Sequence, residues 1–224
     1  MNEIETLENL EKNSVRKYWL GYVIHNLVVK NIFAKSSEKL QNKIMDLIIG
    51  KPKSILDVSC GDDDLIIKIC RKLETNICVA NDLSPKLTSF LNDKGSNITY
   101  TNFNILSQPF TEKFDLVICK NTLHHISNNY QSDLIQYLLK ISKQLIIVDI
   151  EDPRNSTYRS KIWNWYYQIF LGDKGNYFLS FDKFKTILSS PQKEFVLGKI
   201  PTLKGEYMYA TYYPKDFNSN SSLA

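Results

Sequence analysis

A short apolar stretch that ends in an acidic residue and turns at a glycine constrains the fold of this chain more than any other feature. It spans Ser54–Asp64, reads Ser-Ile-Leu-Asp-Val-Ser-Cys-Gly-Asp-Asp-Asp, and lies between Pro52 and a helical run over residues 65–73. The pattern predicts a buried strand, a sharp turn around Gly61 and then a helix. Because open parallel sheets bind ligands at the carboxyl ends of such strands, we expect a ligand site at this turn.

The charge of the turn discriminates among nucleotide-type ligands. A dinucleotide-binding loop needs several glycines so that backbone amides can approach a pyrophosphate, and only Gly61 is present. Asp62, Asp63 and Asp64 stand where that pyrophosphate would lie, and three carboxylates would repel it. The turn therefore favours a ligand that carries positive charge. The alternative is that the three carboxylates only cap the helix in a fold that binds nothing.

The same stretch resembles the acidic-x-Gly-x-Gly-x-Gly motif of class I S-adenosylmethionine-dependent methyltransferases. Asp57 stands at the acidic position, Ser59 at the first glycine, Gly61 at the second and Asp63 at the third, so two of the three glycines are replaced. The resemblance implies S-adenosylmethionine as the cofactor, with Asp57, Ser59 and Gly61 lying against it.

A second predicted strand, over residues 76–84, also ends in an acidic residue. Asp82 lies 25 positions beyond Asp57. In nucleotide-binding sheets an acidic residue about 20 residues beyond the first loop accepts hydrogen bonds from the ribose hydroxyls. We therefore expect Asp82, with Leu83 beside it, to contact the cofactor. The alternative is a turn aspartate before the helix-start signal Ser84-Pro85.

The third predicted strand, over residues 98–103, is followed by Asn104 and Ile105. Methyltransferases often carry Asp and a small apolar residue at this place, beside the adenine ring. The resemblance therefore implies that Asn104 and Ile105 contact adenine, and an amide can hydrogen-bond the adenine edge. An Asn in this position is equally typical of a turn.

The fourth predicted strand starts at Phe114 and leads through Lys120 and Asn121 into Leu123-His124-His125. Small-molecule methyltransferases often share this pattern, and the exit of their fourth strand lines the place where methyl donor and acceptor meet. The resemblance implies that Lys120 and Asn121 contact the donor and that His124 or His125 faces the acceptor. Imidazole titrates near neutrality, so either histidine is a candidate base.

Residues 151–190 interrupt the alternation of strands and helices and are expected to form an insertion over the acceptor site. Arg154 and Arg159 begin this insertion, and Tyr166 belongs to an aromatic stripe on one helical face. Tyr18 lies on an N-terminal helix. We expect these four residues to bind the acceptor. The alternatives are core packing for the aromatic residues and solvated surface for the cations.

The order of the predicted elements indicates the fold class. Strands that alternate with helices predict a parallel sheet, and residues 194–199 and 206–213 predict a final antiparallel pair. The resemblance covers about residues 52–213 and implies an α/β, Rossmann-like, seven-stranded, mostly parallel sheet with helices on both faces. We predict an N-terminal helical cap over residues 1–50, a methyltransferase domain over residues 51–217 and a mobile tail over residues 218–224.

Composition bounds the partners. The net charge of +4 is spread along the chain without a basic run, so we expect no nucleic-acid partner. No segment reaches the roughly 18 apolar residues of a membrane span, and the acidic start is unlike a signal peptide, so we expect a cytoplasmic protein. The four cysteines form no C-x-x-C pair, which predicts reduced core thiols and no metal site.

The function that the resemblance implies is transfer of the methyl group of S-adenosylmethionine by in-line displacement. The preferred acceptor is an oxygen of a small molecule or peptide, in a phenol, alcohol or carboxylate. The alternatives are an N-methyltransferase, a non-catalytic methyltransferase-like subunit, and a nicotinamide-dependent reductase. The sequence leaves the oligomeric state open.

Overall fold

The computed structural model of this 224-residue chain describes residues 23–24, 30–61, 64–83, 97–154, 158–171, 175–189 and 194–213. Within these ranges the strands are β1 (Ser54–Val58), β2 (Ile77–Asn81), β3 (Ile98–Thr101), β4 (Phe114–Lys120), β5 (Ser142–Ile150), β6 (Phe195–Thr202) and β7 (Gly205–Tyr212). The α-helices are α3 (Lys30–Ile32), α4 (Ala34–Leu47), α5 (Leu65–Leu73), α7 (Asn128–Ile141), α8 (Tyr158–Tyr166) and α9 (Phe181–Leu188). A 3-10 turn, η2 (Leu123–His125), follows β4, and a π-helical turn, η3 (Tyr167–Leu171), continues α8.

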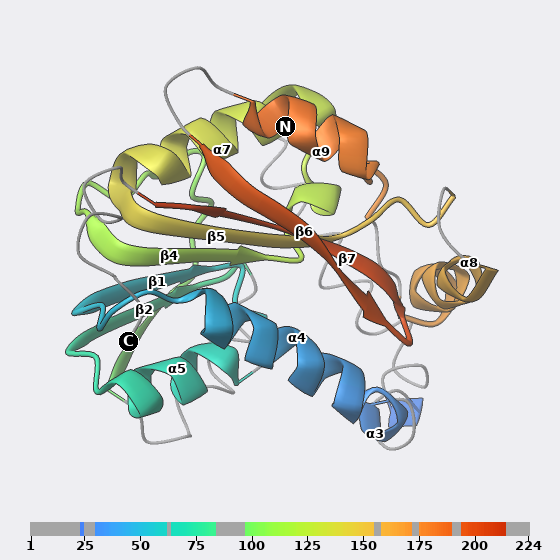
Figure 1. The fold of residues 1–224 in the computed structure, drawn as a ribbon, viewed down its shortest axis with the longest axis horizontal. Coiled ribbons are helices and arrows are strands. Elements are labelled where there is room, and N and C mark those ends of the chain that lie inside the picture. The colour runs from blue at the N-terminus through green and yellow to red at the C-terminus, as the bar shows by residue number, and fades with distance from the viewer. Residues whose placement is uncertain are drawn as a thin grey trace.

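The seven strands form one sheet in the order β3-β2-β1-β4-β5-β7-β6 (Figure 1). The first five strands in this order pair in parallel, and β7 lies antiparallel between β5 and β6. The strand order reverses between β1 and β4, and ligands of open α/β sheets bind at the carboxyl ends of the strands at such a reversal. The predicted fold class is confirmed.

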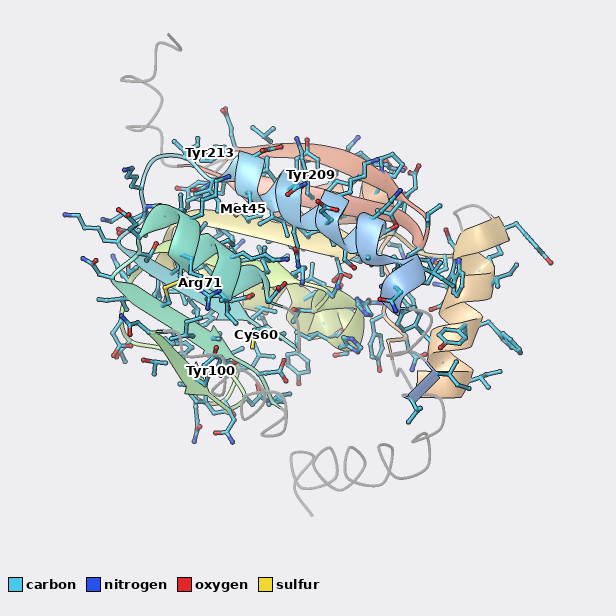
Figure 2. The ribbon with its side chains drawn as sticks, turned by 90° about the horizontal axis from the view of Figure 1, so that it is seen from below. Met45, Cys60, Arg71, Tyr100, Tyr209 and Tyr213 are labelled. Carbon is cyan, nitrogen blue, oxygen red and sulfur yellow. A yellow bond between two sulfur atoms is a disulfide. The ribbon has the colours of Figure 1, made fainter. Side chains whose placement is uncertain are left out.

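Within the described part of the chain, α4 and α5 cover one face of the sheet and α7 and α9 cover the other, since successive strand residues point to opposite sides. Ile55 of β1 packs in the core with Ile44 of α4 and Ile66 of α5. The next residue, Leu56, packs in the opposite core with Leu134 of α7. Seen from below, α4 and α5 lie in front of the sheet (Figure 2). The part of the predicted N-terminal cap that forms α4 therefore packs on this face of the sheet.

Two of the four cysteines form a disulfide, so the prediction that all four are reduced is wrong. Cys70 of α5 is bonded to Cys78 of β2, across the helix-to-strand connection. Cys60 and Cys119 are free and buried, and burial raises the pKa of the Cys119 thiol to about 12. A separation of eight residues matches no cysteine motif, which is why spacing did not reveal the pair.

Among the described residues, no helix combines the length and apolar character needed to cross a bilayer.

Candidate active site

The turn after β1 places two residues in the left-handed region. Ser59 has a φ of 58° and Gly61 a φ of 61°. This conformation costs an L-residue roughly 1–2 kcal/mol and costs glycine little. Position 59 is the place of the first glycine of the motif, so the turn keeps the backbone geometry of a glycine although the residue is serine.

Asp82 ties the end of β2 to this turn. The backbone N–H of Gly61 donates to Oδ2 of Asp82 at 2.9 Å, and the N–H of Cys60 donates to the carbonyl of Asn81 at 3.0 Å. A Cβ added at Gly61 would meet no heavy atom within 4 Å, so the space over the turn is open. The structure therefore brings Gly61 and Asp82 together beside open space, as the cofactor prediction requires. Leu83, the next residue, is 51% exposed.

The neighbouring strand β4 ends in a similar way. Asn121 has a φ of 54°, and its N–H donates to the carbonyl of Val148 at 2.8 Å. Its side-chain oxygen is buried and accepts no hydrogen bond from the described residues. Buried polar atoms are nearly always satisfied, so this oxygen suits a donor group of a bound ligand. Lys120 and Asp57, two other predicted contacts, are buried at the ends of β4 and β1.

Asn104 takes the turn role that the sequence left open. Its Oδ1 accepts the N–H of Leu106 at 2.9 Å, and its carbonyl accepts the N–H groups of Ser107 and Gln108. The side-chain oxygen therefore stabilises the turn after β3. Ile105 is 8% exposed and belongs to the core beneath this turn.

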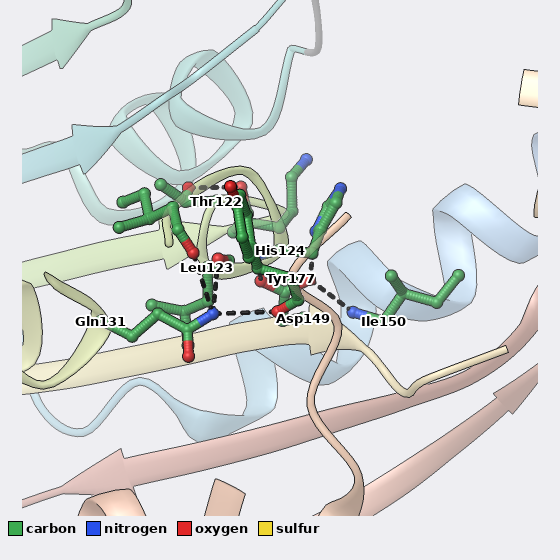
Figure 3. Close-up of polar contacts among 9 residues, drawn as sticks. Thr122, Leu123, His124, Gln131, Asp149, Ile150 and Tyr177 are labelled. Carbon is green, nitrogen blue, oxygen red and sulfur yellow. Dashed lines mark hydrogen bonds and ion pairs between the residues drawn. The ribbon is translucent and has the colours of Figure 1, made fainter. Parts of the chain in front are cut away.

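The two histidines have different surroundings. His124 is 6% exposed, and its Nδ1 lies 2.6 Å from Oδ1 of Asp149 at the end of β5 (Figure 3). The N–H of His124 donates to Oδ2 of the same carboxylate at 3.2 Å, and the N–H of Ile150 donates to Oδ1 at 2.7 Å. A carboxylate on Nδ1 fixes the orientation of an imidazole ring and favours a proton on that nitrogen. His125 is exposed, and its ring centroid lies 4.1 Å from that of His124.

The segment before α9 holds the His124 ring from another side. The N–H groups of Asn176 and Tyr177 donate to the carbonyl of His124, each at 3.1 Å. The Phe178 ring stacks on the His124 ring with an interplanar angle of 4° and centroids 5.2 Å apart. Gln131 of α7 is fully buried, and its Nε2 lies within hydrogen-bond distance of the carbonyls of Leu123, Ile126 and Tyr177. Asp149 and Phe178 therefore hold the imidazole ring, while Asn176 and Tyr177 hold the backbone of His124.

Residues 55–145 match the family model described as a methyltransferase domain. Over this stretch the chain is similar to methyltransferase domains. The match runs from β1 to the first part of β5. It includes the predicted cofactor residues and ends four residues before Asp149. It confirms the resemblance inferred from the motif around Gly61.

Solved methyltransferase structures share the fold of this domain. Magnesium protoporphyrin IX methyltransferase (ChlM) from Synechocystis PCC 6803, with bound S-adenosylhomocysteine, is 16% identical with a TM-score of 0.64, over 84% of this chain and 88% of that chain. Plantazolicin methyltransferase BpumL, in complex with a triazolic desmethylPZN analog and S-adenosylhomocysteine, is 12% identical with a TM-score of 0.61, over 93% of this chain and 99% of that chain. N-methyltransferase NodS from Bradyrhizobium japonicum WM9 is 15% identical with a TM-score of 0.59, over 80% and 87%. At these identities the likeness concerns the fold. A search of curated proteins found no match.

Two of the four residues predicted to bind the acceptor, Arg154 and Tyr166, have side chains within the described part of the chain. Arg154 binds Asp152 through its Nε and Nη2, at 2.8 to 3.2 Å, so its charge is already paired. Burial raises the pKa of the Asp152 carboxyl, but the Arg154 hydrogen bonds outweigh burial and leave that pKa lowered. Tyr166 is half-buried and packs edge-on against Trp163 and Tyr167. Tyr18, Asp62, Asp63 and the Arg159 side chain lie outside the described residues.

Three residues at the site escaped the sequence prediction, namely Asp149, Gln131 and Phe178. Asp149 carried a signal that could have been used, because it is an acidic residue at the end of a buried strand, like Asp57 and Asp82. Gln131 and Phe178 carried none, since their role depends on how α7 and the segment before α9 lie against η2.

A pocket of about 260 Å³ lies at the opposite, amino-terminal edge of the sheet. Asp115 and Lys143 line it and form an ion pair at 2.7 Å. Sites for small ligands usually measure about 300–1,000 Å³ and lie at the carboxyl edge in this type of sheet. The carboxyl edge therefore remains the candidate site for a ligand. Within the described ranges, no group of three or more His, Cys, Asp or Glu residues is arranged to hold a metal ion.

Proposed function

We propose that this protein is an S-adenosylmethionine-dependent methyltransferase that methylates an oxygen of a small molecule or peptide. The observation that carries the proposal is the open turn at Gly61, hydrogen-bonded to Asp82 and next to the left-handed residue that ends β4. Asp57 and Gly61, at the acidic and second-glycine positions of the family motif, lie at this edge of the sheet.

The residues at this edge fit the cofactor. The Asp82 carboxylate, one oxygen of which accepts the Gly61 amide, would accept hydrogen bonds from ribose hydroxyls. The buried oxygen of Asn121 would accept a hydrogen bond from an amino group. The absence of a glycine-rich phosphate loop and the acidic sequence after Gly61 suit a cationic sulfonium better than a pyrophosphate. When bound, S-adenosylmethionine supplies an electrophilic methyl group.

His124 and Asp149 would handle the acceptor proton. With Asp149 on Nδ1, the imidazole accepts a proton at Nε2, and the carboxylate stabilises the imidazolium that results. Burial of both groups excludes water and strengthens their interaction. A phenol or alcohol gains from such a base because it must lose its proton, whereas a carboxylate acceptor is already ionised.

The structural neighbours leave the alternative of N-methylation open. NodS is named an N-methyltransferase, and an amine that arrives protonated also needs a base. The two acceptor classes are distinguished by finding the product. Incubation with isotopically labelled S-adenosylmethionine and a cell extract of the source organism, followed by identification of the labelled molecule, reveals the atom that is methylated.

Variants of the pair then test the role of the histidine. With the acceptor found, His124→Asn and Asp149→Asn should each lower kcat by about 100-fold or more and flatten the pH profile, because general-base catalysis contributes roughly that factor. His125→Asn is the matched control and should keep kcat within a few-fold. Full turnover in both His124→Asn and Asp149→Asn would show that the pair only supports the structure, and a carboxylate acceptor would then be favoured.

A further inference from the structure

An apolar stripe faces solvent along α8 and η3. Its members are spaced by four, three and four residues and so share one side of a helix, and they are Tyr158 (78% exposed), Ile162 (44%), Trp165 (56%) and Ile169 (47%). The inward side is formed by Trp163, whose ring lies 4.3 Å from that of Phe33 in an edge-on contact, and by Tyr166. The exposed stripe therefore lies on the side of this helix that does not pack against the core.

Two neighbouring elements extend the stripe into a larger surface. Ile32 of α3 is 53% exposed, and Leu203 in the turn between β6 and β7 is 47% exposed. This turn lies against α8, because a Cβ at Gly205 would come within 2.5 Å of the Ser160 Oγ. Figure 1 shows α3, α8 and this turn at one end of the molecule. We name the six exposed residues the α8 surface: Ile32, Tyr158, Ile162, Trp165, Ile169 and Leu203.

Cations border the α8 surface. Residues 155–171 include Arg159 and Lys161 and contain no Asp or Glu. Lys161 is exposed on α8 itself. Lys204 lies in the turn, over the rings of Phe33 and Tyr167 at 5.1 and 5.3 Å. An apolar stripe bordered by cations is complementary to a surface with an anionic outer layer and an apolar layer beneath it.

We propose that the α8 surface docks on anionic lipid membranes. Trp165 and Tyr158 would lie at the level of the headgroups, where amphipathic rings are favoured, and Ile162 and Ile169 would reach the acyl boundary. Lys161 and Lys204 would lie against the lipid phosphates. A second copy of this chain fits the surface less well, because two-fold pairing would bring like cations together. This inference goes beyond the proposed methyl transfer and does not depend on it.

Vesicle sedimentation tests the proposal with the full chain. The protein should sediment with vesicles of mixed phosphatidylglycerol and phosphatidylcholine and much less with phosphatidylcholine alone. Binding should weaken when the salt concentration rises from about 0.1 M to about 1 M, since the Debye length falls from about 10 Å to about 3 Å. The Trp165 region should also show a blue-shifted fluorescence on binding.

Matched variants separate the α8 surface from charge in general. Tyr158→Glu should weaken vesicle binding by at least about tenfold, because it replaces an apolar contact with a repelled charge. Tyr130→Glu, at a position 57% exposed in the first turn of α7, is the control and should bind within about twofold of the wild type. Lys161→Glu should weaken binding without loss of apolar area, with Lys140→Glu of α7 as its control.

Three results would overturn the proposal. The first is absence of binding to the anionic vesicles. The second is equal loss in Tyr158→Glu and Tyr130→Glu, which would indicate attraction to the net charge of the protein. The third is self-association in sedimentation equilibrium that Tyr158→Glu abolishes, without vesicle binding, which would make the α8 surface a contact between copies.

Discussion

Single residues in the left-handed region mark the carboxyl edge of the sheet. Ser59 and Asn121 adopt positive φ directly after β1 and β4, the two strands between which the strand order reverses. This conformation is energetically unfavourable for residues other than glycine, and residues that adopt it cluster at functional sites. Ser59 adopts the left-handed backbone conformation that the first glycine of the motif would adopt, and this conformation lowers the stability of the protein. The turn can therefore form without the glycine.

Ser59→Gly should therefore stabilise the protein. Relief of the left-handed strain should raise the free energy of unfolding by about 1 kcal/mol, after the extra flexibility of glycine in the unfolded chain is subtracted. Urea denaturation measures the change. Ser59→Ala keeps the strain and should show no gain, and equal stability of the glycine and alanine variants would argue against strain at this position.

At the scale of elements, the sequence predicted the strands and the sheet because apolar runs and strand-end acids are local signals. The antiparallel pair at the end of the chain was also predicted, although β6 is longer and the turn between β6 and β7 is shorter than expected. The inward side of α8 was recognised as an aromatic stripe, but its outward side was not, since both sides are apolar. Contacts between distant elements, such as Gln131 with residues 123–126 and 177, left no local pattern.

One such contact holds β1 to the start of β4. Oδ2 of Asp115 accepts the N–H groups of Lys53 and Ser54 at 2.8 and 3.3 Å, and the N–H of Asp115 donates to Oγ of Ser54. Lys143 binds Oδ1 and is the main reason that the pKa of this carboxyl is lowered. Since the folded pKa is below the unfolded one, the stabilisation is present above about pH 4 and is lost as the pH falls through the folded pKa.

Asp115→Ala should accordingly lower the free energy of unfolding by about 1–3 kcal/mol at pH 7, because two backbone donors lose a charged acceptor. The difference from the wild type should shrink when the pH falls below about 4. Lys143→Ala, whose side chain is 67% exposed, should cost less than about 1 kcal/mol. A constant difference between wild type and Asp115→Ala from pH 7 to pH 3 would exclude the charge as its cause.

At the scale of the whole molecule, the disulfide between Cys70 and Cys78 reduces the number of free thiols from four to two. The unreduced protein should react with two equivalents of a thiol reagent after denaturation, because only Cys60 and Cys119 are free. Reduction of the bond should lower the free energy of unfolding by about 2–3 kcal/mol in the chain-entropy account of a short loop. Four reactive thiols in the unreduced protein would contradict the bond.

Binding of S-adenosylhomocysteine, measured by titration calorimetry, tests the central claim most directly. The wild type should bind S-adenosylhomocysteine saturably and should not bind a nicotinamide dinucleotide. Asp82→Ala should weaken the binding by about tenfold or more, since a charged hydrogen bond is worth about 1.5–3 kcal/mol, while the fold stays intact by circular dichroism. Asp46→Ala, an acidic position on α4, is the control and should bind like the wild type. Saturable binding of the dinucleotide, with no heat from S-adenosylhomocysteine, would contradict the account.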